Sequence, residues 1–366
     1  MREDSRARIL ERYRANAPEV DELLVYTESQ FEPPIQRLTF PLDDEPHVDA
    51  WRRYVKEADV TGVFPALQNV LVQLRFPIRR GISQEEGYRS VTLRGISPDE
   101  VPDATGLSLR DPEGLRLVLQ PTVAGTIPVL IVPRREDFVR LVQALGMRNE
   151  PGDVPRSMGA TTVGGLVNWD RIACLRRGWE CGHPFDGAAG WAEELSRIQR
   201  RRELYQDRLI LLSTGPYSDV SARDIQLPED EWLRLSLAIR VEHESTHYAT
   251  RRIFGSMRNN AFDELIADYV GITSATGRYD SGWLLRFMGL ESWPKYRENG
   301  RLGNYRGHPP LSLGAFRILQ ALTHDAALAL ATIPAASFEP EDLQSKGDML
   351  LRLSALTLPE LAASTG

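Results

Sequence analysis

The feature that most constrains the fold is a pair of histidines, His243 and His247, which stand four residues apart in a segment patterned as a long helix. Pro228 can occupy the first helical position and Gly255 follows the last, so the sequence predicts one helix reaching about Phe254. Residues four apart project from the same face of a helix, one turn apart. Both imidazoles can therefore reach a single metal ion at roughly 2.0–2.1 Å.

Carboxylates accompany the two histidines. Glu244 is rotated away from the histidine pair but lies on the adjoining face, where it can act on a water at the metal. A second helix is predicted from about residue 260 to 270, ending at Gly271. Glu264 on this helix follows His247 by 17 residues, which is enough for a turn and an antiparallel return. Asp268 lies one turn beyond Glu264, where it can accept a ring N–H from a metal-binding histidine.

The pattern His-Glu-x-x-His at 243–247, followed by Glu-x-x-x-Asp at 264–268, resembles the gluzincin branch of zinc metallopeptidases, the thermolysin-like group. The resemblance covers about residues 207–275. It implies three zinc ligands, which are His243, His247 and Glu264. It also implies that Glu244 is the general base and that Asp268 supports a ligand histidine. A strand at 207–213 is then expected at the sheet edge that aligns an extended substrate.

Two roles have more than one candidate residue: the third metal ligand and the donor to the oxyanion. Asp263, beside Glu264, is an alternative third ligand, as are Asp268 and a remote histidine. The resemblance further implies a downstream histidine that donates a hydrogen bond to the oxyanion of the reaction, and His308 is the candidate. The substitutes for His308 in this role are Tyr305, Arg306 and Tyr248.

The 366 residues exceed one compact core, and the pattern along the chain predicts an α+β protein in two parts. Short β-type runs at 90–94, 115–119 and 127–132 precede an amphipathic helix at 135–145. They predict a smaller N-terminal α/β module over residues 1–150, and the Pro- and Gly-rich residues 149–160 are expected to form a linker. Residues 151–366 are expected to form a zincin-like, mainly helical catalytic half with a small β-sheet. Its other predicted elements are helices at 191–205, 313–331 and 341–363.

Composition excludes several classes of protein. The net charge of −7 gives no reason to expect nucleic acid as a partner, and 42% hydrophobic with 26% charged residues is ordinary for a globular protein. No run of 18 uncharged apolar residues predicts a membrane span. The charged first eight residues lack the apolar region of a secretory signal, so a cytoplasmic location is expected. Cys174 and Cys181 are too few for a disulfide framework.

The leading functional hypothesis is a zinc-dependent hydrolase, a metallopeptidase or amidase, acting on a peptide or small amide substrate through water and Glu244. Two alternatives remain. Two histidines and one carboxylate are also the ligands of non-haem Fe²⁺ oxygenases, which could modify a peptide or a small metabolite. A non-catalytic module stabilised by its metal is the other alternative. No local motif indicates the identity of the substrate or the oligomeric state.

Overall fold

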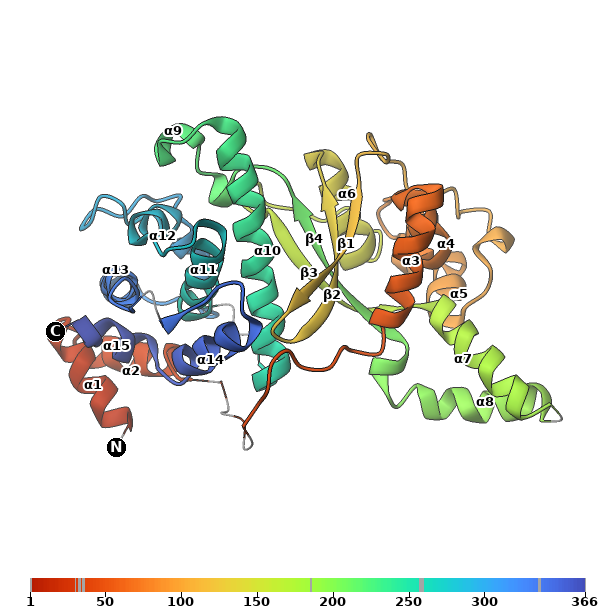
Figure 1. Ribbon diagram of the computed structural model, residues 1–366, viewed down its shortest axis with the longest axis horizontal. Helices are drawn as coiled ribbons and strands as arrows, with labels where there is room; N and C mark the ends of the chain where they lie inside the picture. Colours follow the sequence, from red (N-terminus) through yellow and green to blue (C-terminus); the bar gives the residue numbers. More distant parts are fainter. Residues whose placement is uncertain are drawn as a thin grey trace. The chain divides into compact units, whose positions relative to one another are not determined.

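A computed structural model describes residues 2–29, 31, 34, 37–184, 186–256, 260–334 and 337–365 (Figure 1). The predicted α+β class is confirmed: the chain is mostly helical and has one four-stranded mixed sheet. Its contacts divide it into two compact units. The helical unit comprises Met1–Leu42, Thr122–Ala124 and Pro216–Gly366, and the sheet unit comprises Asp43–Pro121 and Gly125–Gly215.

The sheet has the strand order β1-β2-β4-β3. The strands are β1 (Arg116–Thr122), β2 (Gly125–Val132), β3 (Ala160–Val167) and β4 (Gln206–Ser213). β4 pairs in parallel with β2 and antiparallel with β3, and Ile210 lies opposite Val129 on one side and Thr162 on the other. The inner strands β2 and β4 are almost wholly buried, which explains their continuous apolar runs.

This strand order contradicts one expectation. The resemblance implied that residues 207–213 lie at the edge of the sheet, ready to pair with an extended substrate. β4 instead lies inside the sheet, and its backbone pairs with β2 on one side and β3 on the other. A strand paired on both sides has no free row of N–H and C=O groups to offer a peptide.

The helices of the sheet unit are α3 (Val48–Thr61), α4 (Val63–Val70), α5 (Glu86–Arg94), α6 (Arg135–Gly146), α7 (Trp169–Gly182) and α8 (Gly187–Ile198). The helix predicted at 135–145 and the strands predicted at 115–119 and 127–132 are confirmed. The strand predicted at 90–94 is wrong, because these residues belong to α5. There Tyr88 and Val91, three positions apart, pack against Phe76 and Ile82, and this helical burial outweighs the β preference of the local residues.

The two units do not follow the predicted boundary near residue 150. Residues 160–213 belong to the sheet unit because β3 and β4 are strands of its sheet. Residues 1–42 belong to the helical unit because α1 (Arg2–Arg12) packs against α15 (Leu358–Ala362) and α2 (Ala17–Tyr26) packs against α13 (Leu313–Leu330). Long-range pairing therefore decides the division, and the Pro- and Gly-rich residues 149–160 connect α6 to β3 within one unit.

The helical unit is built around α10 (Glu229–Phe254), the long green helix of Figure 1, with α11 (Ala261–Thr276) packed beside it. The other helices of this unit are α9 (Ala222–Ile225), α12 (Ser281–Met288) and α14 (Leu343–Ser354). Pro228 is the N-cap of α10, which confirms the predicted start of that helix within a residue. The predicted helix at 341–363 is two helices, because a capping box at Thr357 starts α15 afresh. Within the described ranges, every helix is too short or too polar to span a bilayer.

Candidate metal centre

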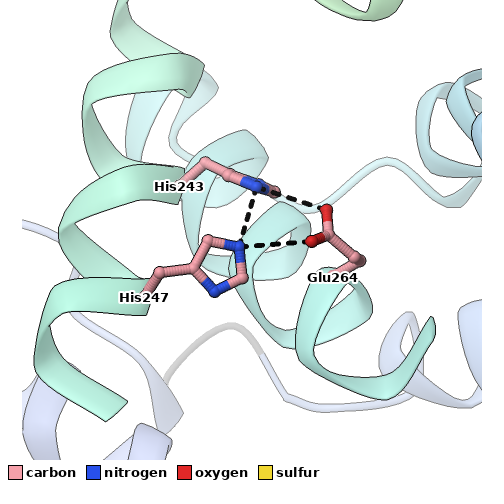
Figure 2. Close-up of side chains that lie close together, drawn as sticks. All are labelled: His243, His247 and Glu264. Carbon is pink, nitrogen blue, oxygen red and sulfur yellow. Dashed lines mark hydrogen bonds and ion pairs between the residues drawn. The ribbon is translucent and has the colours of Figure 1, made fainter. Parts of the chain in front are cut away.

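Three side chains converge between α10 and α11: His243, His247 and Glu264 (Figure 2). The Nε2 atoms of the two histidines are 3.1 Å apart. Each Nε2 is 3.4 Å from one carboxylate oxygen of Glu264. Two ligand atoms at 2.0–2.1 Å from a tetrahedral zinc ion lie about 3.3 Å from each other. The separation of the two nitrogens is close to one edge of a tetrahedral site, and one ligand atom from each of the three residues lies within 4.8 Å of the others.

The donor atoms are buried and have few other partners. His243, His247 and Glu264 are 4–6% exposed. Nδ1 of His243 lies 2.9 Å from Oδ1 of Asp268, and a carboxylate can only accept, so Nδ1 carries the proton and Nε2 presents its lone pair to the other two residues. Nδ1 of His247 has no hydrogen-bond partner among the described residues. A proton or a cation at the centre of the three side chains is needed to satisfy these facing lone pairs.

The first turn of α11 places Glu264. Asn260 is the N-cap, and its side chain accepts hydrogen bonds from the backbone N–H groups of Phe262 and Asp263. This cap fixes the start of the helix just before Glu264, so that the carboxylate leaves the first turn toward α10. Asp268 follows one turn later on the same face, as the sequence predicts.

Gly271 sets how closely α11 approaches α10. The sequence predicted that this glycine ends the helix, but α11 continues to Thr276, so that prediction is wrong. A Cβ at position 271 would lie 2.9 Å from the backbone O of Ile239 and 3.6 Å from the backbone N of His243. A side chain does not fit in that space, so the two helices reach ligand distance only with glycine here.

The variant Gly271→Ala is expected to separate the two helices. Overpacking of this kind destabilises a fold by about 1–3 kcal/mol, and the displaced Glu264 would bind metal more weakly. Urea unfolding and competition with a chromophoric chelator measure the two effects. The matched control is Gly178→Ala in α7, where a Cβ meets nothing within 4 Å; it is expected to add about 0.5–1 kcal/mol of stability. Unchanged stability and metal affinity in Gly271→Ala would contradict this account of the helix contact.

Asp268 belongs to a buried network that the sequence did not predict. Tyr217, from the turn Tyr217–Asp219, donates from its hydroxyl to Oδ1 of Asp268 at 2.7 Å. Arg301, from the 3₁₀ turn Arg301–Tyr305, donates to Oδ2 of Asp268 and, at 3.1 Å, to the Tyr217 hydroxyl. Its guanidinium also lies 3.8 Å from Glu264. Both residues lie outside the two motif helices and belong to no local pattern, so no sequence signal marks them.

Electrostatics favour a positive charge at this centre. Burial lowers the pKa of His243, but hydrogen bonds with Asp268 and Glu264 outweigh burial and raise that pKa to about 9. Burial raises the pKa of Glu264, but the two histidines outweigh it and hold that pKa well below its usual range. The raised pKa of His243 and the lowered pKa of Glu264 mean that, without a metal, a proton between them supplies the positive charge. A metal ion bound at this centre would take the place of that proton.

The other predicted residues divide into those near the three ligands and those away from them. Glu244 is half-buried and interacts electrostatically with His247. Burial raises the pKa of the Tyr305 hydroxyl, and the charge of Glu264 and a hydrogen bond with Glu264 raise it further. Asp263 is buried but lies outside the group that could hold a metal. His308 is exposed and makes no hydrogen bond or ion pair with the three ligand residues within the described ranges.

The two substitutes for His308 other than Tyr305 are engaged elsewhere. Arg306 donates to the backbone O of Leu311 at 2.5 Å and lies over the ring of Phe316. Tyr248 is 1% exposed, and the guanidinium of Arg252 lies over its ring. Among the four candidates for an oxyanion donor, the structure thus brings Tyr305 next to a ligand residue, whereas the leading candidate of the sequence, His308, is not brought there.

Comparison with known proteins gives one match. Residues 8–365 match DUF7005, which is described as a family of unknown function. Neither the curated proteins nor the solved structures include a match to this chain. The family match spans nearly all 366 residues, both motif helices and both units. The chain therefore belongs to DUF7005, a family of unknown function.

Proposed function

We propose that this protein is a zinc-dependent hydrolase that cleaves a peptide or small amide bond, with Glu244 as its general base. The observation that carries the proposal is the convergence of His243, His247 and Glu264 at distances of 3.1 to 3.4 Å between two packed helices. Two histidines and one glutamate are a donor set of catalytic zinc sites, which leave the fourth position open to water or substrate. A zincin-like fold of the helical unit is part of this proposal, and the cytoplasmic location stays a prediction.

The residues around the ligands suit this chemistry. Zinc, when bound, would polarise a carbonyl and lower the pKa of a water toward ~7. Glu244, half-buried beside His247, would accept a proton from the attacking water and pass it to the leaving amine. The Tyr305 hydroxyl stays protonated because burial and Glu264 raise its pKa, so it can donate to a developing oxyanion.

A second candidate function, that of a non-haem Fe²⁺ oxygenase, would use the same three side chains as metal ligands. Two histidines and one carboxylate are also the donor set that non-haem Fe²⁺ oxygenases use, with open positions for dioxygen and substrate. What favours zinc is the charge of Glu244, which acts on His247 and would supply the base needed for proton transfer from water.

The test uses the full chain purified without chelators. We expect about one zinc per chain by elemental analysis, and hydrolysis of a mixed peptide library detected by mass spectrometry. A chelator should abolish the hydrolysis, and added Zn²⁺ should restore it. Bound iron with turnover that consumes dioxygen would reverse the choice in favour of an oxygenase. Loss of the fold on chelation, with no turnover of any peptide, would instead indicate a metal-stabilised module.

A further inference from the structure

Tyr217 occupies a place beside the proposed metal ligands that nothing in the motif explains. Its hydroxyl oxygen lies 2.8 Å from Nδ1 of His243 and 2.7 Å from Oδ1 of Asp268. The same Nδ1 and Oδ1 are 2.9 Å apart. Three polar atoms therefore form a closed triangle on the side of the His243 ring opposite to Nε2. The Asp268 carboxylate accepts from both the ring N–H and the phenol, so the two hydrogen bonds together fix the orientation of the His243 ring.

The surroundings of Tyr217 keep its ring in one position. The guanidinium groups of Arg240 and Arg301 lie 5.6 and 5.4 Å from the ring centroid. The ring of Phe287 packs edge-on at 4.9 Å. The backbone N–H of Tyr217 donates to Oγ of Ser236 on α10 at 3.0 Å. This hydrogen bond attaches Tyr217 to α10, the helix that carries His243. The Tyr217 hydroxyl is therefore held at a fixed position relative to the imidazole ring of His243.

The backbone directly after Tyr217 is strained. Ser218 and Asp219 are consecutive non-glycine residues in the left-handed region, with φ of 52° and 56°. Residues in sparsely populated regions cost about 1–3 kcal/mol each and cluster at binding and catalytic sites. Oγ of Ser218 accepts a hydrogen bond from Arg301 at 2.9 Å, and Arg301 also donates to Asp268. Because of this sharp turn, the hydroxyl groups of Tyr217 and Ser218 both accept hydrogen bonds from the guanidinium of Arg301.

From this geometry we propose that Tyr217 is a positioning residue, which orients the His243 ring so that its Nε2 faces the metal position. The inference rests on the proposed function, because it assumes that His243 binds a metal ion. A phenylalanine would keep the ring contacts with Phe287, Arg240 and Arg301. The loss of the Tyr217 hydroxyl would remove one of the two hydrogen bonds that Oδ1 of Asp268 accepts. It would also remove the contact between that hydroxyl and Nδ1 of His243. Mutation of such outer groups lowers metal affinity or activity about 10–100-fold.

The experiment compares Tyr217→Phe with the wild type by zinc competition against a chromophoric chelator and by the absorption spectrum of the Co²⁺-loaded protein. We expect zinc affinity to fall about 10–100-fold and the Co²⁺ bands to shift, because the geometry at His243 changes. The matched control is Tyr88→Phe in the sheet unit, which removes another buried hydroxyl, the one that donates to Asn149 at 3.2 Å. This control should lower the unfolding midpoint but leave zinc affinity and the Co²⁺ spectrum unchanged.

A second variant separates the hydroxyl from the ring. Phe287→Leu loosens the packing against Tyr217 but keeps its hydroxyl, so it should destabilise the protein and lower zinc affinity less than Tyr217→Phe does. Equal zinc affinity in Tyr217→Phe and wild type would overturn the inference while leaving the metal site intact. A wild-type protein that binds no zinc would overturn the proposed function and this inference together.

Discussion

Glu244→Gln is expected to bind zinc as tightly as the wild type and to hydrolyse peptide substrates about 10²–10⁴-fold more slowly. The amide side chain is isosteric with the carboxylate but cannot accept a proton from water. Zinc affinity should be retained because the three proposed ligand residues are His243, His247 and Glu264, and Glu244 is not among them. The measurement is the initial rate of peptide cleavage by zinc-loaded protein, with metal content determined on the same sample.

Glu242→Gln is the control for this variant. Glu242 stands two positions earlier on α10 and forms an ion pair with Lys346 at 2.6 Å. Its change removes a carboxylate from the same helix, so some stability is lost while the rate of cleavage should not change. A metal-loaded Glu244→Gln protein as active as the wild type would remove Glu244 from the mechanism.

Glu264→Gln is expected to lower zinc affinity by more than about 100-fold. Loss of a residue that only supports a metal ligand lowers affinity by up to about 100-fold, and loss of a ligand itself should cost more. A neutral amide is a weaker ligand than a carboxylate, and the charge that attracts a cation beside His243 and His247 also disappears. Zinc competition measures the loss, and circular dichroism checks that the helices remain. This variant should also be inactive, because without bound metal a water is not activated at neutral pH.

Asp263→Asn distinguishes the two candidates for the third ligand. Asp263 and Glu264 are adjacent and both are 2–5% exposed, but only Glu264 lies in the group with the two histidines. The Asp263 variant should therefore keep its zinc. If it loses zinc while Glu264→Gln retains it, the third ligand is Asp263, and the geometry of the centre has to be assigned anew.

The parts of the site that the sequence predicted are those that a helix determines locally. The spacing of His243 and His247 brings both rings to one face because of the period of the α-helix alone. The starts of α10 and α11 also follow from local signals, since Pro228 and Asn260 occupy the two N-cap positions. The convergence of Glu264 with the histidines was implied by a resemblance, and the structure brings the three together.

Predictions from local sequence patterns were wrong where contacts between distant segments determine the structure. Residues 90–94 have the composition of a strand, yet they form part of α5, because their helical face packs on residues outside the segment. β4 was recognised as a strand, but its place inside the sheet depends on pairing with β2 and β3, which begin about 81 and 46 residues earlier. From the sequence, Gly271 was predicted to end a helix, but it lies inside α11. The close approach of α10 explains why a glycine occupies this position.

By itself the sequence determined the two motif helices and the face on which the histidines lie, whereas the resemblance to a zinc hydrolase stays a prediction. Only the tertiary structure decided how the ligands are supported, because Tyr217 and Arg301 lie 51 and 33 residues from Asp268 along the chain and reach it through turns with no pattern of their own. Helical periodicity is a property of neighbouring residues, whereas a buried hydrogen-bond network depends on which distant segments fold against one another.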